Sequence, residues 1–341
     1  MRVLRESLVT MLAAHTQSVV SPPSPDVVAA VPPARPGAKR WVKWGVRYAI
    51  AAAILWWLFT QFEFAQVLAA LRQADWRWLG AAGLASVALQ VIIAIRLRRL
   101  IMAQGIDLST RELFEINLAT MFYGLFLPGG NFAGLAVRLF RLGKEGGDLT
   151  GAGVALFIDR IVATISLCLV GMAFWLLERP DDTWPIFAVM AGATAAMVLM
   201  CVAITARWPL PGPLRKWGGK LQAAMQKWRT MSRRDHVQVL LLGVASHVVG
   251  IVVFVCLAWS LNVSVGFISL GWIRSAVILA TMIPISVGGL GLREGAMVVM
   301  LQAYAVSEPD ALAMSLLVFA TVLLLPGLLG AVYEARRLFT R

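Results

Sequence analysis

Long apolar segments with almost no charges constrain this chain more than any other feature. Six of them approach or exceed about 20 residues, the length that a helix needs to cross the hydrocarbon core of a bilayer. The chain as a whole is 59% hydrophobic and 14% charged, whereas soluble domains are about 45–50% apolar and about 25% charged. This excludes a soluble enzyme, a disordered chain and a disulfide scaffold, and the lack of period-two alternation excludes an outer-membrane barrel. The predicted spans are 44–62, 78–101, 151–177, 183–206, 237–261 and 311–333.

The region before the first span differs in composition from the rest of the chain. Residues 1–38 read as a disordered tail, because the stretch 21–37 is rich in proline. Residues 39–341 form the predicted polytopic membrane domain. We divide this domain into half A, about 44–177, and half B, about 183–335.

Two further apolar segments, 112–142 and 267–304, are each broken near the middle. Residues 127–130 read Leu-Pro-Gly-Gly, and residues 284–291 begin with proline and contain three glycines. Proline removes a backbone donor and clashes with the preceding turn, and successive glycines destabilise a helix further. We therefore expect each segment to form two half-helices, the second starting near Asn131 and near Leu292.

The distribution of charge predicts how these segments lie in the membrane. The chain carries 31 Lys and Arg against 18 Asp and Glu, a net charge of +13, and basic loops remain in the cytoplasm. By this rule 112–142 begins and ends on the cytoplasmic side, and 267–304 begins and ends outside. Both are predicted to be re-entrant hairpins, entering from opposite faces. The prediction is an all-α integral membrane protein with about six spans and two hairpins in an inverted repeat, with both termini cytoplasmic.

The two breaks are the candidate binding region. Irregular backbone at membrane depth lines a cavity or is buried in protein, and interrupted segments at matching positions of two halves indicate a transporter's binding site. The N-termini of the half-helices favour an anion such as a lipid phosphate, which Arg138 and Arg293 could bind bidentately. Packing kinks between crossing helices are the alternative. The break residues concerned are Pro128, Gly129, Gly130, Pro284, Ser286, Gly288, Gly289 and Gly291.

Charges within the apolar segments complete the candidate site, since ionisable groups there are costly and usually face a cavity or each other. Asp159 could neutralise Arg138, Arg160 or a substrate cation, could carry a proton, or could form a structural ion pair. Glu294 adjoins Arg293, and pairing between them is expected ahead of a proton relay.

Other polar residues in the apolar segments are given structural roles. His247 is expected to be a packing residue with its hydrogen bonds satisfied, and Arg274 to extend its side chain towards the membrane surface. Arg96, Arg98 and Arg99 are expected to be interfacial anchors.

The sequence offers no sign of catalysis or of a cofactor. It contains no GxSxG, HExxH, P-loop or dinucleotide motif. Cys168, Cys201 and Cys256 lie in apolar segments without metal-binding spacing. The positive charge is attributed to cytoplasmic loops facing anionic lipid, so nucleic acid is not expected as a partner.

Four motifs resemble the lysylphosphatidylglycerol synthase transmembrane-region family, the flippase-like domain of bacterial multiple-peptide-resistance proteins and their stand-alone relatives. The motifs are residues 109–114, residues 126–138, the Asp159-Arg160 pair and residues 283–295. The resemblance covers about 40–335. In full-length relatives this domain is thought to move aminoacylated phosphatidylglycerol between leaflets, while a separate soluble domain synthesises that lipid.

The resemblance implies transport or an accessory role, because the soluble synthase domain is not expected here. Many relatives have an acidic residue just before the arginine of the first hairpin motif, whereas residues 134–137 are Gly-Leu-Ala-Val. A lysyl-lipid substrate is therefore not favoured, and hopanoid or lipid-linked glycan pathways remain open. We predict a non-enzymatic lipid translocase of the bacterial inner membrane with membrane lipids as partners. The alternative is a non-transporting partner of a lipid-modifying enzyme or glycosyltransferase, bound through the basic loop 207–236.

Overall fold

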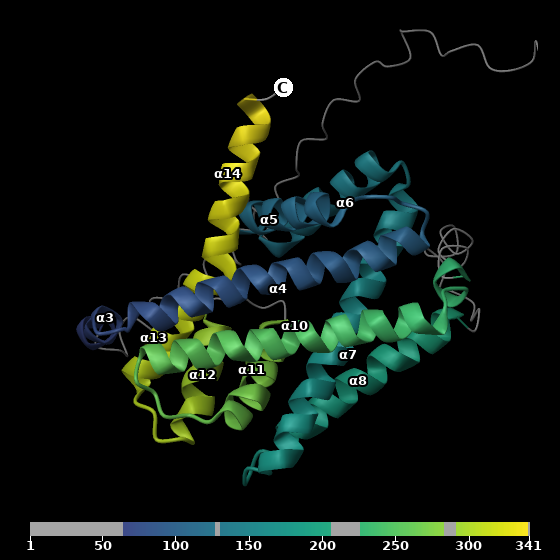
Figure 1. Cartoon of the computed structure of the whole chain (residues 1–341). Helices are drawn as coiled ribbons and strands as arrows, with labels where there is room; N and C mark the ends of the chain where they lie inside the picture. Colours follow the sequence, from purple (N-terminus) through teal and green to yellow (C-terminus); the bar gives the residue numbers. More distant parts are fainter. Residues whose placement is uncertain (1–63, 127–129, 206–225, 283–290, 340–341) are drawn as a thin grey trace, which may run out of the picture. The chain divides into compact units, whose positions relative to one another are not determined.

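A computed structural model describes residues 64–126, 130–205, 226–282 and 291–339 (Figure 1). All of these belong to one compact unit, Trp44–Arg341. The predicted tail, the span 44–62 and most of the loop 207–236 lie outside the described residues.

The described residues form helices and no strand, and the chain is an all-α integral membrane protein. Five helices are long and apolar enough to cross a bilayer, and they correspond to five of the predicted spans: Trp76–Ala103, Leu149–Glu178, Trp184–Val202, Arg233–Ser260 and Glu308–Arg337. The elements are α3 (Phe64–Arg72), α4 (Trp76–Ala103), α5 (Thr110–Phe126), α6 (Asn131–Gly146), α7 (Leu149–Glu178), α8 (Trp184–Thr205), α10 (Arg233–Ser260), α11 (Phe267–Thr281), α12 (Leu292–Gln302), α13 (Glu308–Val318), η3 (Phe319–Leu324) and α14 (Leu325–Phe339).

Polar caps set the starts of several helices. The carboxylate of Asp148 accepts from the backbone N–H groups of Thr150 and Gly151 at 3.0 and 2.9 Å at the start of α7. Ser109 donates both its backbone N–H and its hydroxyl to Glu112 at 2.7 Å just before and within α5. These hydrogen bonds lower the pKa of the exposed Glu112 carboxyl below its usual value.

The two broken segments each fold back on themselves. The half-helices α5 and α6 pack together, as do α11 and α12. The second half-helices begin at Asn131 and Leu292, as expected. Each follows a glycine with positive φ, 52° at Gly130 and 84° at Gly291, a conformation that glycine adopts without the penalty of a side chain.

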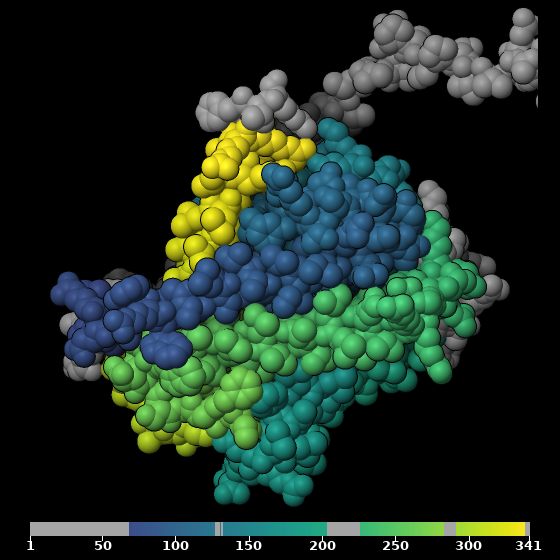
Figure 2. All heavy atoms as spheres, in the orientation of Figure 1, coloured from purple at the N-terminus to yellow at the C-terminus, as the bar shows by residue number. Residues whose placement is uncertain are grey.

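The long helices pair between the two predicted halves. The longest contact runs between α4 and α10, which lie side by side in Figure 1 and meet along the visible face in Figure 2. The hairpin arm α5 packs against α14, and the hairpin arm α11 packs against α7. Each broken hairpin is therefore held by a long helix of the other half.

Small residues allow the first hairpin to pack closely. A methyl group at Gly134 of α6 would lie 2.6 Å from the carbonyl oxygen of Thr120 on α5. A methyl group at Gly330 of α14 would overlap the carbonyl oxygen of Leu118, which also lies on α5. Backbone approaches of this kind are how membrane helices gain van der Waals contact, and they place α5 between α6 and α14.

The last long helix contains a π-helical segment, η3, which ends two residues before Pro326. The backbone N–H group of Leu325 donates to the carbonyl of Ala320, five residues earlier. In the same pattern the carbonyl of Thr321 would accept from residue 326, but Pro326 has no N–H group. The hydroxyl of Ser86 on α4 donates to this carbonyl at 2.8 Å. The proline thus accounts for the irregular turn, and α4 supplies the missing donor.

Candidate functional site

A buried ion pair joins α4 to α7. The Nε atom of Arg96 lies 2.8 Å from Oδ1 of Asp159, and the two residues are only 3% and 6% exposed. Of the alternatives for Asp159, the structure therefore supports an ion pair, with a partner that the sequence analysis had not assigned.

The expectation that Arg96, Arg98 and Arg99 share one role is wrong for Arg96. Arg98 donates to the carbonyl of Leu108 at 3.1 Å, and Arg99 lies 4.0 Å from Asp235 near the surface. Arg96 instead points into the bundle. A sequence signal for this existed, because Arg96 lies two helical turns after Leu89 and one turn before Leu100, on the face of α4 that also carries Ala82 and Ser86.

Arg138 on α6 lies close to this ion pair. The charges that act on it are those of Asp159, Arg96 and Arg160. Its Nε and Nη2 atoms are enclosed, and neither has a hydrogen-bond partner among the described residues. Because Asp159 is already bonded to Arg96 and Arg160 is exposed, Arg138 is a half-buried positive charge with two enclosed nitrogen atoms whose donors are free.

The start of α6 adds a second feature that favours an anion. The cap residue Gly130 makes no side-chain hydrogen bond to the first turn, so the N–H groups there are not capped by a described side chain. Arg138 follows two turns later on the same half-helix. Both features carry positive charge, from the dipole and from the guanidinium.

Two buried carboxamides were missed by the sequence analysis. Gln90 on α4 is 1% exposed and Asn117 on α5 is 4% exposed. The side-chain N and O atoms of both have no hydrogen-bond partner in the described parts of the chain. The turn between α4 and α5 lies between Arg96 and Asn117 in the sequence. Because the two residues are about equally far from this turn, they lie at a similar depth in the bundle. Enclosed amides of this kind indicate a polar ligand or ordered water.

The second break presents a different, neutralised arrangement. Arg293 is in contact with the carboxylate of its neighbour Glu294, as expected, and its Nε donates to Ser315 at 3.1 Å. Its guanidinium carbon also lies 5.2 Å from the ring centre of Phe319. Glu294 in turn accepts from the backbone N–H of Gly291 at 2.6 Å and so caps α12. Arg293 therefore has partners on three sides, whereas Arg138 has free donors.

Arg274 does not extend to the membrane surface as expected. It is 5% exposed and lies against α10, with its guanidinium carbon 5.8 Å from the ring centre of Phe254. Gly250 leaves room for it, because a methyl group there would overlap the guanidinium. Its Nη1 is 3.4 Å from Nδ1 of His247, whose Nε2 is 2.9 Å from the carbonyl of Ala163. That carbonyl can only accept, so Nε2 carries the proton and His247 is hydrogen-bonded, as expected.

The remaining predicted site residues fall in two groups. Gly130 and Gly291 cap the second half-helices, and Arg160 is exposed on α7. The break residues Pro128, Gly129, Pro284, Ser286, Gly288 and Gly289 lie outside the described residues.

Comparison with known proteins supports the resemblance found in the motifs. The chain matches the family model for the lysylphosphatidylglycerol synthase TM region over residues 44–330. No curated protein matches the chain. The matched range covers most of the chain, including both broken hairpins. It also includes Arg138 and the neighbouring Arg96–Asp159 pair, which together we call the Arg138 site.

Proposed function

Because the chain belongs to the lysylphosphatidylglycerol synthase transmembrane-region family, we propose that it is a flippase-like lipid translocase of the bacterial inner membrane. It moves an anionic or modified phospholipid, or a lipid-linked headgroup, between the two leaflets. The family match and the five membrane-spanning helices support a membrane role, and the chemistry of the Arg138 site supports the substrate class.

The observation that carries this proposal is the free guanidinium of Arg138. Two donor atoms of this half-buried guanidinium are removed from water without gaining a partner, which costs about 1–3 kcal/mol or more, and a described carboxylate that could compensate, Asp159, is bonded to Arg96. A phosphate group would supply both the negative charge and the acceptors that Nε and Nη2 lack. Asn117, at a depth similar to that of Arg96, has unpartnered donor and acceptor atoms for other polar groups of a headgroup.

The proposed architecture is an inverted repeat with two re-entrant hairpins and cytoplasmic termini. It is supported by the matched packing of the two halves, in which α14 holds α5 and α7 holds α11. It is also supported by the basic residues near the ends of α6 and α14, Lys144, Arg336 and Arg337, because such residues favour the cytoplasmic side.

The charge balance of the site favours an anionic headgroup over a lysyl headgroup. A cationic group would need an unoccupied carboxylate, and Asp159 is engaged by Arg96 at 2.8 Å. Residues 134–137 supply no acidic side chain next to Arg138. A phosphate without a compensating amine is the group that these residues fit best.

The test is headgroup movement in vesicles reconstituted with the purified protein and a fluorescent anionic phospholipid. We expect Arg138→Gln to reduce the rate at least tenfold, since loss of a charged hydrogen-bonding group costs about 1.5–3 kcal/mol. Arg160→Gln is the matched control, because Arg160 lies near the same charges but is exposed, and it should keep the wild-type rate. An Arg138→Gln protein that is folded and moves lipid normally would refute this site. Binding of the lipid without movement by the wild-type protein would favour the accessory-partner function instead.

A further inference from the structure

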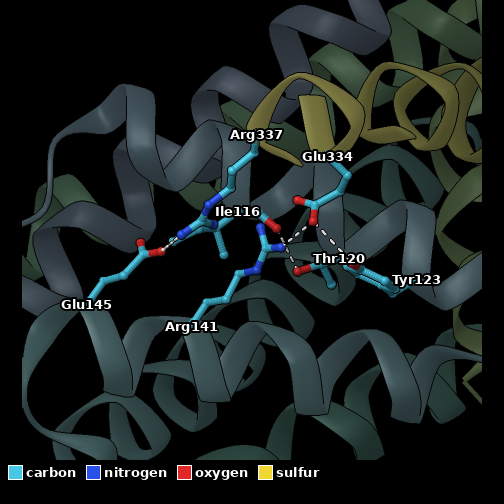
Figure 3. Close-up of polar contacts among 7 residues, drawn as sticks. All are labelled: Ile116, Thr120, Tyr123, Arg141, Glu145, Glu334 and Arg337. Carbon is cyan, nitrogen blue, oxygen red and sulfur yellow. Dashed lines mark hydrogen bonds and ion pairs between the residues drawn. The ribbon is translucent and has the colours of Figure 1, made fainter. Parts of the chain in front are cut away.

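A carboxylate on α14 joins the first hairpin to the other half of the molecule (Figure 3). Glu334 Oε2 lies 2.5 Å from Nη2 of Arg141 on α6 and accepts from the hydroxyl of Tyr123 on α5 at 3.0 Å. The Arg141 guanidinium also lies 5.9 Å from the ring centre of Tyr123. We call Tyr123, Arg141 and Glu334 the Glu334 cluster. It connects both arms of the first hairpin to one helix.

A carboxylate at the end of α7 makes the corresponding connection to the second hairpin. Oε1 of Glu178 accepts from the hydroxyls of Ser269 and Tyr304 at 2.6 and 2.9 Å, and Oε2 accepts from Nε1 of Trp272 at 2.8 Å. Ser269 and Trp272 belong to α11, and Tyr304 follows α12. We call these four residues the Glu178 cluster, which likewise connects both arms of a hairpin to one helix.

The two clusters occupy matching positions. Each carboxylate lies near the end of the long helix that follows one hairpin, and each binds the hairpin of the other half. Each accepts a hydrogen bond from a tyrosine. This correspondence between unrelated local sequences indicates a shared role and not two accidental surface contacts.

The clusters lie at opposite ends of the bundle. Arg337 on α14 pairs with Glu145 at the end of α6 at 2.9 Å (Figure 3), so the end of α14 is next to the turn from which α7 starts. Helix α7 has 30 residues and is therefore about 45 Å long. Glu178, its last residue, lies across the thickness of a bilayer from Glu145.

We propose that the Glu334 cluster and the Glu178 cluster are the two gates of the lipid pathway. The Glu334 cluster is the gate at the membrane face where α14 ends, and the Glu178 cluster is the gate at the opposite face. In this scheme, which rests on the proposed translocase function, one cluster separates while the other stays closed. The two halves rock about the Arg138 site, as in transporters built from inverted repeats. Hydrogen bonds between neighbouring halves suit this purpose, because they can be exchanged for hydrogen bonds to water when a gate opens.

The experiment measures the accessibility of one reporter cysteine behind each gate, and it does not depend on lipid movement. Thr120→Cys reports on the first hairpin and Ser275→Cys on the second, each one turn from the aromatic donor of its cluster, Tyr123 or Trp272. Both are introduced into a protein in which Cys168, Cys201 and Cys256 are alanine. A membrane-impermeant maleimide is applied to intact cells and, separately, to inside-out vesicles.

We expect Glu178→Gln to raise labelling at Ser275→Cys severalfold from outside and to lower labelling at Thr120→Cys from inside. Glu334→Gln should have the reverse effect on both reporters. The reciprocal decrease is the decisive result, because a merely structural role for either carboxylate would loosen its own hairpin alone. Independent increases at both sites, or no change at either, would overturn the proposal.

Glu308→Gln is the matched control, because Glu308 is an exposed carboxylate whose hydrogen bond to Gln302 stays within one half. It should change neither reporter. Melting temperatures of all variants establish that each is folded. If labelling is reciprocal but reconstituted protein moves no lipid, the gates stand and the translocase proposal fails. If lipid moves without reciprocal labelling, the gates alone are refuted.

Discussion

At the scale of single residues, the structure depends on a few polar groups that find partners on distant helices. The Ser86 hydroxyl is an example, because it bonds to the carbonyl that Pro326 leaves without a donor. We expect Ser86→Ala to destabilise the protein by about 1–3 kcal/mol, the cost of an unsatisfied buried polar group. Thermal unfolding in detergent measures this. Thr164→Ala is the control, since its hydroxyl donates to the backbone carbonyl of Arg160, four residues earlier in the same helix. An equal effect of both changes would contradict the assignment.

The Arg96–Asp159 pair supports a second prediction at this scale. Removing one partner leaves an uncompensated buried charge, so Asp159→Asn should cost about 3–5 kcal/mol. The double variant Arg96→Met with Asp159→Leu should recover most of that stability, because apolar residues of similar volume replace buried ion pairs well. Unfolding in detergent again provides the measurement. If the double variant is no more stable than Asp159→Asn, the two charges do not contribute only through their mutual pairing, and this prediction fails.

At the scale of elements, close helix contacts depend on glycine. We expect Gly134→Ala to destabilise the α5–α6 hairpin by about 1–3 kcal/mol, because the new methyl group must displace the backbone of α5. Gly295→Ala on α12 is the opposite case, since a methyl group there meets nothing within 4 Å. It should be neutral or stabilising by about 0.5–1 kcal/mol, as alanine is favoured in helices. Melting temperatures that move in the same direction for both changes would argue against this packing.

Elements were also the level at which sequence predicted structure best. Five spans and both half-helix starts followed from hydropathy, proline and glycine, because these properties act locally. The partner of Asp159 did not follow, since helical periodicity identifies a buried face but not the side chain that meets it. Glu178 lies just beyond the predicted span 151–177, and only tertiary packing brings Ser269, Trp272 and Tyr304 around it.

At the scale of the whole molecule, the two broken hairpins place their arginines in dissimilar surroundings. Arg293 has Glu294, Ser315 and Phe319 as partners, whereas Arg138 has enclosed donors without partners among the residues described. The sequence analysis assigned both arginines the same role, because each follows a break of proline and glycine in an apolar segment. Their surroundings differ because Glu294 follows Arg293 directly and pairs with it, while Asp159, whose charge acts on Arg138, is bonded to Arg96.

The shortness of α12 has a consequence for biosynthesis. Its 11 residues reach about 16 Å, roughly half of the hydrocarbon thickness, and α11 with 15 residues is also too short to cross it. Neither can leave the translocon as an independent span. We expect α13 to be synthesised before α11 and α12 pack against the rest of the bundle. Assembly of the second hairpin would then follow insertion of the long helices into the membrane.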